Sequence, residues 1–146
     1  MATTIIAVLG TLLGGITTHL LQERGARTAR NDARDRDRLV AITELVTALA
    51  DHRRAMWTSR TASLSGADTE KRDAALAAAH ATRSAITAPL TTLALLTPGL
   101  AGPGREAATA TYAMREAADL PALEMARAEA HRTADALVDA ASQYFN

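Results

Sequence analysis

The sequence predicts an all-α protein, with an N-terminal single transmembrane helix followed by an antiparallel helical bundle of three to four helices. Three observations predict this fold. Residues 2–21 carry no formal charge, later segments repeat apolar residues at three- and four-residue spacing, and no segment alternates as a strand does. We therefore expect a transmembrane anchor over 1–21, an Arg-rich juxtamembrane helix or linker over 22–38, and a cytoplasmic helical bundle over 39–146.

The expected anchor is the run ATTIIAVLGTLLGGITTHLL, residues 2–21. As a helix it would rise about 30 Å, which is about the thickness of the hydrocarbon core of a bilayer. Nine residues are Ile, Leu or Val, which favours insertion, whereas five threonines, three glycines and His19 oppose it. A cleaved signal peptide is disfavoured, because positive charge follows the run instead of preceding it. A soluble amphipathic helix is the stronger alternative, since the large apolar residues form one stripe.

Small residues form the opposite face of this predicted helix. Gly10 and Gly14 make a G-x-x-x-G pattern, and Thr18 lies one turn further along. Two helices with such a face can approach closely and gain dispersion contacts in lipid. We therefore expect transmembrane packing through these three residues and a homo-oligomer. The pattern is also short, and glycine and threonine are common in membrane spans in any case.

The segment over residues 22–38 is rich in arginine. Six arginines against four acidic residues leave it a net charge of +2. Arg24, Arg27 and Arg30 come first, where they would contact the anionic headgroups of a lipid bilayer. By the positive-inside rule they predict a single-pass protein of the cytoplasmic (inner) membrane with its C-terminus in the cytoplasm. A solvated helix face is the alternative for this segment. Nucleic-acid binding is disfavoured by the interleaved aspartates.

The expected bundle consists of helical segments separated by breakers. The segments cover residues 39–60, 69–97, 105–118 and 121–144, and Pro89 should kink or loosen the second. Asp68 is the expected N-cap of the second segment, and Asp119 with Pro121 marks the start of the last. The PGLAGPG sequence at 98–104 predicts a loop. The last two segments are either separate helices or one bent helix.

Several kinds of chemistry find no support in the sequence. The chain has no cysteine, so disulfides and thiolate metal sites are excluded, and its formal net charge is zero. The histidines show no metal-binding spacing, and no phosphate-binding glycine loop or G-x-S-x-G nucleophile motif is present. We therefore expect no catalytic, metal or cofactor site, and no cofactor. The neutral charge also argues against a general nucleic-acid binder.

Charged and polar residues on the first two bundle segments are candidates for a common layer. Two histidines and two arginines, with two acidic residues as expected partners, form this predicted polar layer. Its members are Asp51, His52, Arg53, His80, Arg83 and Glu116. An unpaired buried charge would be very costly, so we expect Arg53 and Arg83 to pair with Asp51, Glu116 or Asp119. A layer that sets helix register is favoured over an acid–base or anion site, because no nucleophile accompanies the histidines.

Four phrases of the sequence resemble a known family. They are AVLGTLLGG at 7–15, ITELVTALADHRRAMW at 42–57, HATRSAITAPLTTLALLTPGL at 80–100 and ALVDAA at 136–141. Together they resemble the small membrane-anchored KilB-type proteins of actinobacterial, Streptomyces-like conjugative plasmids. The resemblance implies a non-enzymatic accessory protein that supports a plasmid-transfer or intramycelial-spread complex, with membrane proteins of the transfer machinery as partners. It implies no catalytic residues.

Two other functions stay open from the residues alone. The first is a regulatory or nucleic-acid-binding helical protein that uses the Arg-rich stretch 24–38, and a salt-dependent shift of DNA would favour it. The second, less favoured function is a small enzyme that uses His52 and His80.

Overall fold

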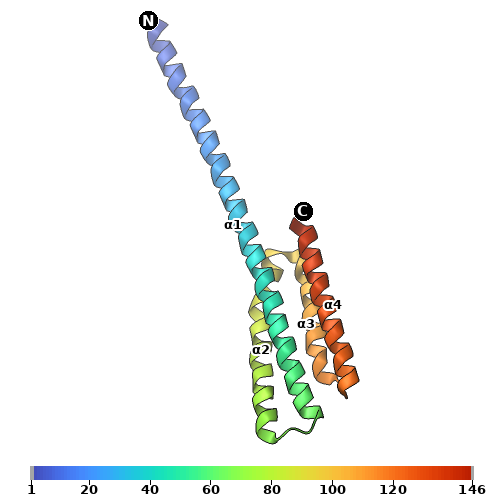
Figure 1. Cartoon of the computed structure of the whole chain (residues 1–146). Coiled ribbons are helices and arrows are strands. Elements are labelled where there is room, and N and C mark those ends of the chain that lie inside the picture. Colours follow the sequence, from blue (N-terminus) through green and yellow to red (C-terminus); the bar gives the residue numbers. More distant parts are fainter. Residues whose placement is uncertain (1, 146) are drawn as a thin grey trace. The chain divides into compact units, whose positions relative to one another are not determined.

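Four α-helices and two 3-10 helices make up the backbone described by the computed structural model. The backbone is described for residues 2–145, and the side chains are described for residues 27–145. The elements are α1 (Ala2–Leu64), α2 (Thr69–Leu96), η1 (Pro98–Leu100), α3 (Ala101–Ala113), η2 (Met114–Glu116) and α4 (Leu120–Phe145) (Figure 1). Helices α3 and α4 are separate, because η2 and residues 117–119 lie between them.

The predicted membrane anchor is contradicted. Within the residues that the structure describes, no helix combines the length and the apolar character needed to cross a membrane. The N-terminal transmembrane helix of the predicted fold class and the predicted single-pass location in the inner membrane are therefore wrong. The described side chains of α1 begin at residue 27, and residues 27–38 are rich in charge, whereas residues 2–21, on which the prediction rested, lie outside the described side chains. Helix α1 also continues from this run into the Arg-rich segment without a break.

The chain divides into two units, Met1–Asp37 and Arg38–Asn146. The first unit is a stretch of α1, and most residues assigned there to packing or headgroup contact lie outside the described side chains. These residues are Gly10, Gly14, Thr18 and Arg24. Arg27 and Arg30 are described, and both are exposed on α1.

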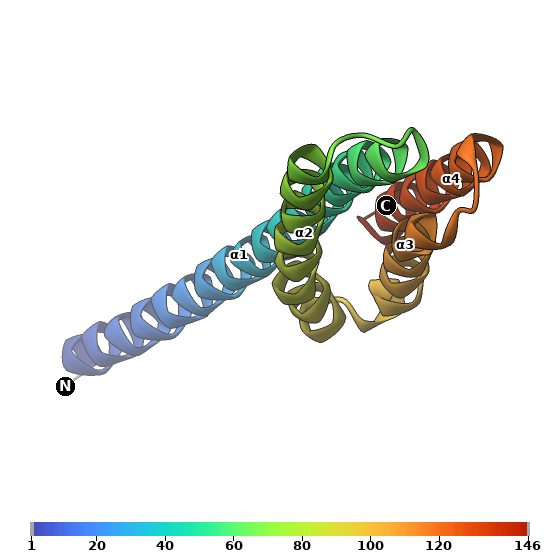
Figure 2. The ribbon, with the colours of Figure 1, turned by 90° about the horizontal axis from the view of Figure 1, so that it is seen from below.

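The second unit is an antiparallel bundle. From Arg38 to Leu64, α1 runs antiparallel to α2, and α3 runs antiparallel to α4 (Figure 1). The four helices surround a common interior when the bundle is seen from below (Figure 2). One part of this interior contains aliphatic and alanine side chains from all four helices and from η1. Its residues are Ile42, Leu45, Ala48, Leu49, Ile86, Leu93, Leu100, Ala107, Ala108, Leu137 and Ala141.

A smaller apolar cluster lies nearer the turn between α1 and α2. It consists of Met56, Ala79, Met114, Ala117, Leu123 and Ala130, with Trp57 and Leu64 packed against it. Alanines form half of this cluster and much of the larger one, which allows the helices to pack closely. Each alanine contributes little transfer free energy, so the few large side chains carry most of the hydrophobic stabilisation.

Local hydrogen bonds end α1 at Leu64, beyond the predicted end at residue 60, and begin α2 and α4 at the predicted caps. Gly66 has a φ of 69°, and the N–H groups of Gly66 and Ala67 donate to the carbonyls of Ser63 and Ala62, which is a Schellman ending. The Asp68 carboxylate accepts from the N–H of Lys71 at 2.9 Å. The Asp119 carboxylate likewise accepts from the N–H of Ala122 at 2.8 Å. Both predicted caps are confirmed.

The predicted loop over residues 98–104 is wrong. Residues 98–100 form η1, and 101–104 are the first turn of α3. Leu100 and Ala101 are buried in this segment, so packing holds a sequence rich in glycine and proline in helical conformation. The prolines are compatible with it, because the N–H groups at the start of a helix have no partner within the helix.

Replacement by alanine is predicted to lower the stability of the bundle more at Gly104 than at Gly102. An alanine Cβ at Gly104 would lie 3.0 Å from Leu93 Cδ2 and 3.1 Å from Leu90 Cδ1, whereas one at Gly102 would have nothing within 4 Å. Both changes gain helix propensity, but only Gly104→Ala overpacks the core. We expect Gly104→Ala to be less stable than Gly102→Ala by about 1 kcal/mol in urea unfolding. Equal or greater stability of Gly104→Ala would show that the leucines move aside freely.

Candidate functional site

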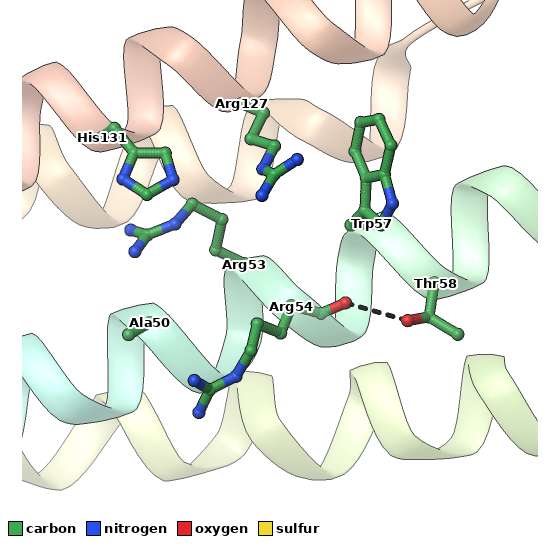
Figure 3. A pocket seen from close by; sticks show the side chains of 7 residues that line it. All are labelled: Ala50, Arg53, Arg54, Trp57, Thr58, Arg127 and His131. Atoms are coloured by element: carbon green, nitrogen blue, oxygen red, sulfur yellow. Dashed lines mark hydrogen bonds between the residues drawn. The ribbon is translucent and has the colours of Figure 1, made fainter.

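A pocket of about 380 Å³ between α1 and α4 gathers basic side chains. We call it the basic pocket, and its lining residues are Ala50, Arg53, Arg54, Trp57, Thr58, Arg127 and His131 (Figure 3). Arg53 and Trp57 are four residues apart on α1, and Arg127 and His131 are four apart on α4. Each pair therefore lies on one face of its helix.

The basic side chains do not all point the same way. Arg53, Arg127 and His131 lie between the two helices, whereas Arg54 points away from α4 (Figure 3). Arg54 is ion-paired with Asp51. The guanidinium of Arg127 lies over the indole of Trp57, with its Cζ atom 4.8 Å from the ring centroid. This cation–π contact holds Arg127 beside the pocket.

Burial and neighbouring positive charges lower the pKa of Arg53 and of His131 in the basic pocket. The pKa of Arg53 is lowered by burial and then by the charge of Arg127, while Asp135 acts in the opposite direction. The pKa of His131 is lowered by partial burial and by Arg53 and Arg127, again against Asp135. Among the described residues, no carboxylate lies within 4.0 Å of Arg53 or Arg127. The site is therefore suited to holding an anion.

His52 of the predicted polar layer lies in the interior of the bundle. It is 1% exposed, and its Nδ1 atom lies 2.9 Å from Thr82 Oγ1. The Thr82 hydroxyl donates to backbone carbonyls of its own helix, so it accepts from His52 Nδ1–H. The His52 ring also meets Tyr112 edge to face, with centroids 5.6 Å apart. This arrangement joins α1, α2 and α3.

The other members of the predicted layer are dispersed. His80 and Arg83 are exposed on α2, and Glu116 pairs with its neighbour Arg115 at 2.5 Å. The guanidinium of Arg83 lies 4.3 Å from the ring centroid of Tyr112. The prediction that Arg53 and Arg83 pair with nearby carboxylates is therefore wrong. Arg83 makes a cation–π contact with the ring of Tyr112 instead, because an aromatic ring attracts a cation without being charged.

Among the residues of these two sites, Thr82, Tyr112, Arg127 and His131 were not predicted from the sequence as site residues. The four-residue spacing of Arg127 and His131 indicates that they share one face of a helix. The sequence could not predict that this face lies against Arg53, since that depends on how α4 is rotated against α1.

A second surface feature lies between α1 and α4, nearer the end of α4. We call it the apolar groove, and its lining residues are Leu39, Ile42, Thr43, Val46, Thr47, Val138, Ala141, Ser142 and Phe145. It encloses about 290 Å³. Leu39 is 57% exposed, and Val138 and Phe145 are 42% and 41% exposed. Large apolar side chains thus face water along both helices.

Residues 39–145 match the KilB plasmid transfer protein family. Protein KilB of Streptomyces lividans is 51% identical over 145 residues, which cover 99% of each chain. No solved structure matches the chain. The resemblance to KilB-type proteins is thereby confirmed apart from its membrane-anchored detail. The chain belongs to the KilB plasmid transfer protein family.

Proposed function

We propose that this protein is a non-enzymatic accessory protein that supports assembly of a plasmid-transfer or intramycelial-spread complex through helix–helix contacts. Membership of the KilB family supports a role in plasmid transfer. The observation that carries the rest is the apolar groove between α1 and α4. Its occupant in this proposal is the same groove of a second copy of the chain.

The exposed apolar residues of the groove support association. Leu39, Val138 and Phe145 leave apolar surface in water, and burying such surface contributes about 25 cal/mol per Å². A contiguous exposed apolar surface is typical of a protein interaction site.

The charge of the chain supports a second copy as the occupant. The whole chain has a formal net charge of zero, and residues 39–146 have ten basic against twelve acidic residues. Electrostatic repulsion between copies is therefore small. A two-fold axis would place each groove against its own image, so that the surface on each copy is covered at once.

Single cysteines test this interface directly, because the natural chain has none. Val138→Cys in the full chain should form a disulfide-linked dimer under mild oxidation at least tenfold faster than Leu76→Cys. Leu76 is the matched control, since it is 50% exposed on α2 and does not line the groove. Equal rates at the two positions would rule out the groove as the contact between copies.

A charge in the groove tests the function. Val138→Glu should leave helix content and melting temperature close to those of the natural chain, because Val138 faces solvent. It should reduce plasmid transfer between mating strains at least tenfold, whereas Leu76→Glu should leave transfer unchanged. Full transfer with Val138→Glu, in a protein shown to have lost dimerisation, would mean that self-association does not serve transfer.

A further inference from the structure

We propose that the basic pocket is a binding site for a compact, doubly charged oxyanion of the phosphate class. Arg53 and Arg127 would bind its oxygens, and His131 would bind at its edge. This site is distinct from the apolar groove, and the proposal does not depend on the function proposed above.

The two pocket arginines have no close counter-ion among the described residues. Arg53 and Arg127 are both half-buried, and among the described residues no carboxylate lies within 4.0 Å of either. A half-buried positive charge is normally paired, since burial removes part of its hydration. Two such charges facing each other from different helices repel, and an anion between them would convert that repulsion into attraction.

The nearby acidic residues do not already fill this role. Asp51 is ion-paired with Arg54, which points away from α4 (Figure 3). Asp135 is exposed on α4 and acts on Arg53 and His131 only over a longer range. It would compete weakly with a bound anion, so its removal should strengthen binding.

The shape and chemistry of the pocket lining also suit a phosphate group. The side chains of Arg53, Arg127 and His131 converge from two helices on the space between them (Figure 3). The indole of Trp57 holds Arg127 in place, which lowers the entropy lost on binding. Guanidinium groups present parallel N–H donors that match the oxygens of phosphate. The volume of about 380 Å³ also leaves room for a small organic group attached to the phosphate.

The chain supplies its own probe for this site. Trp57 is the only tryptophan, and it lines the pocket. Titration of the full chain with sodium phosphate, with sodium chloride at equal ionic strength as the reference, should give a saturable change in its fluorescence. A phosphate response that is unsaturable and equal to that of chloride would overturn the proposal.

Three variants assign the response to the pocket. Arg53→Gln should weaken phosphate binding at least tenfold, and Asp135→Asn should strengthen it severalfold. Arg132→Gln is the matched control, because Arg132 is exposed on α4, pairs with Glu129 and does not line the pocket. Equal losses in Arg53→Gln and Arg132→Gln would overturn the proposal by showing general charge screening. Calorimetry and circular dichroism on each variant separate lost binding from lost folding.

The source of the phosphate is distinguished by the ligand used. Inorganic phosphate and adenosine monophosphate share the charged group, so tighter binding of the nucleotide would assign the site to an esterified phosphate. Equal affinities would assign it to the free anion. A short single-stranded DNA that binds far more tightly, with a steep dependence on salt, would replace this proposal with a nucleic-acid site.

Discussion

Replacement of Leu137 by alanine should lower the free energy of unfolding by about 2–5 kcal/mol. Leu137 is 0% exposed, and it packs in the larger core cluster with residues from every other helix of the bundle. The change removes buried apolar surface and leaves a cavity that the surrounding helices fill only in part. The loss is large for this protein because many of the other core residues are alanines.

Met125→Ala is the matched control for that prediction. Met125 lies on the same helix, is 75% exposed, and has a helix propensity close to that of alanine. Urea unfolding followed by circular dichroism should therefore place Met125→Ala within about 0.5 kcal/mol of the natural chain. Comparable losses in the two variants would show that α4 is not held by the core contact of Leu137.

Acidification from pH 7 to pH 5.5 should destabilise the bundle through His52. Burial and the charge of Arg83 lower the pKa of His52 below its ordinary value of 6.5, against a smaller opposing effect of the Ala79 backbone. The buried Nε2 atom has no hydrogen-bond partner, so a proton there would be unsatisfied. At a pH between the ordinary and the lowered pKa, His52 binds a proton in the unfolded chain but not in the folded chain.

The sign of the effect follows from this difference in proton binding. The contribution of His52 is fully present above pH 6.5 and decreases as the pH falls below that value. One proton changes the free energy of unfolding by at most about 1.4 kcal/mol per pH unit, so the loss at pH 5.5 is at most about 2 kcal/mol. The exposed carboxylates with lowered pKa values, such as Asp68, act at lower pH.

Two variants test the assignment to His52. His52→Phe should remove most of the pH dependence between 7 and 5.5, since Thr82 keeps its hydrogen bonds to the carbonyls of Ala78 and Ala79. His131→Gln should remove only a small part, because His131 is exposed and water solvates its charged form. A pH dependence that persists in His52→Phe would assign the acid sensitivity to other groups.

Most of the helical segments, with the caps at Asp68 and Asp119, could be predicted from the sequence, because local interactions specify them. The spacing of apolar residues over 39–60 or 121–144 depends only on the period of the helix. The caps at Asp68 and Asp119 are hydrogen bonds to N–H groups three residues away. The family could also be recognised from short phrases of the sequence, and the match over residues 39–145 confirms it.

For the membrane anchor and the loop at 98–104, local sequence patterns led to wrong predictions. An uncharged run of twenty residues predicted a membrane span, but within the described residues no helix is long and apolar enough to cross a membrane. Glycines and prolines predicted a loop, yet burial of Leu100 and Ala101 holds this segment in helices.

The sequence by itself determined most of the helices of this protein, the caps at Asp68 and Asp119, and the family to which the chain belongs. Only the tertiary structure decided which side chains meet across helices. Arg53 and Arg127 are 74 positions apart, and they line one pocket because α4 turns that face toward α1. The adjacent residue His52 instead meets Thr82 and Tyr112, because successive helical residues point in different directions. Such rotations are set by the packing of whole helix faces, which a pattern along one helix does not specify.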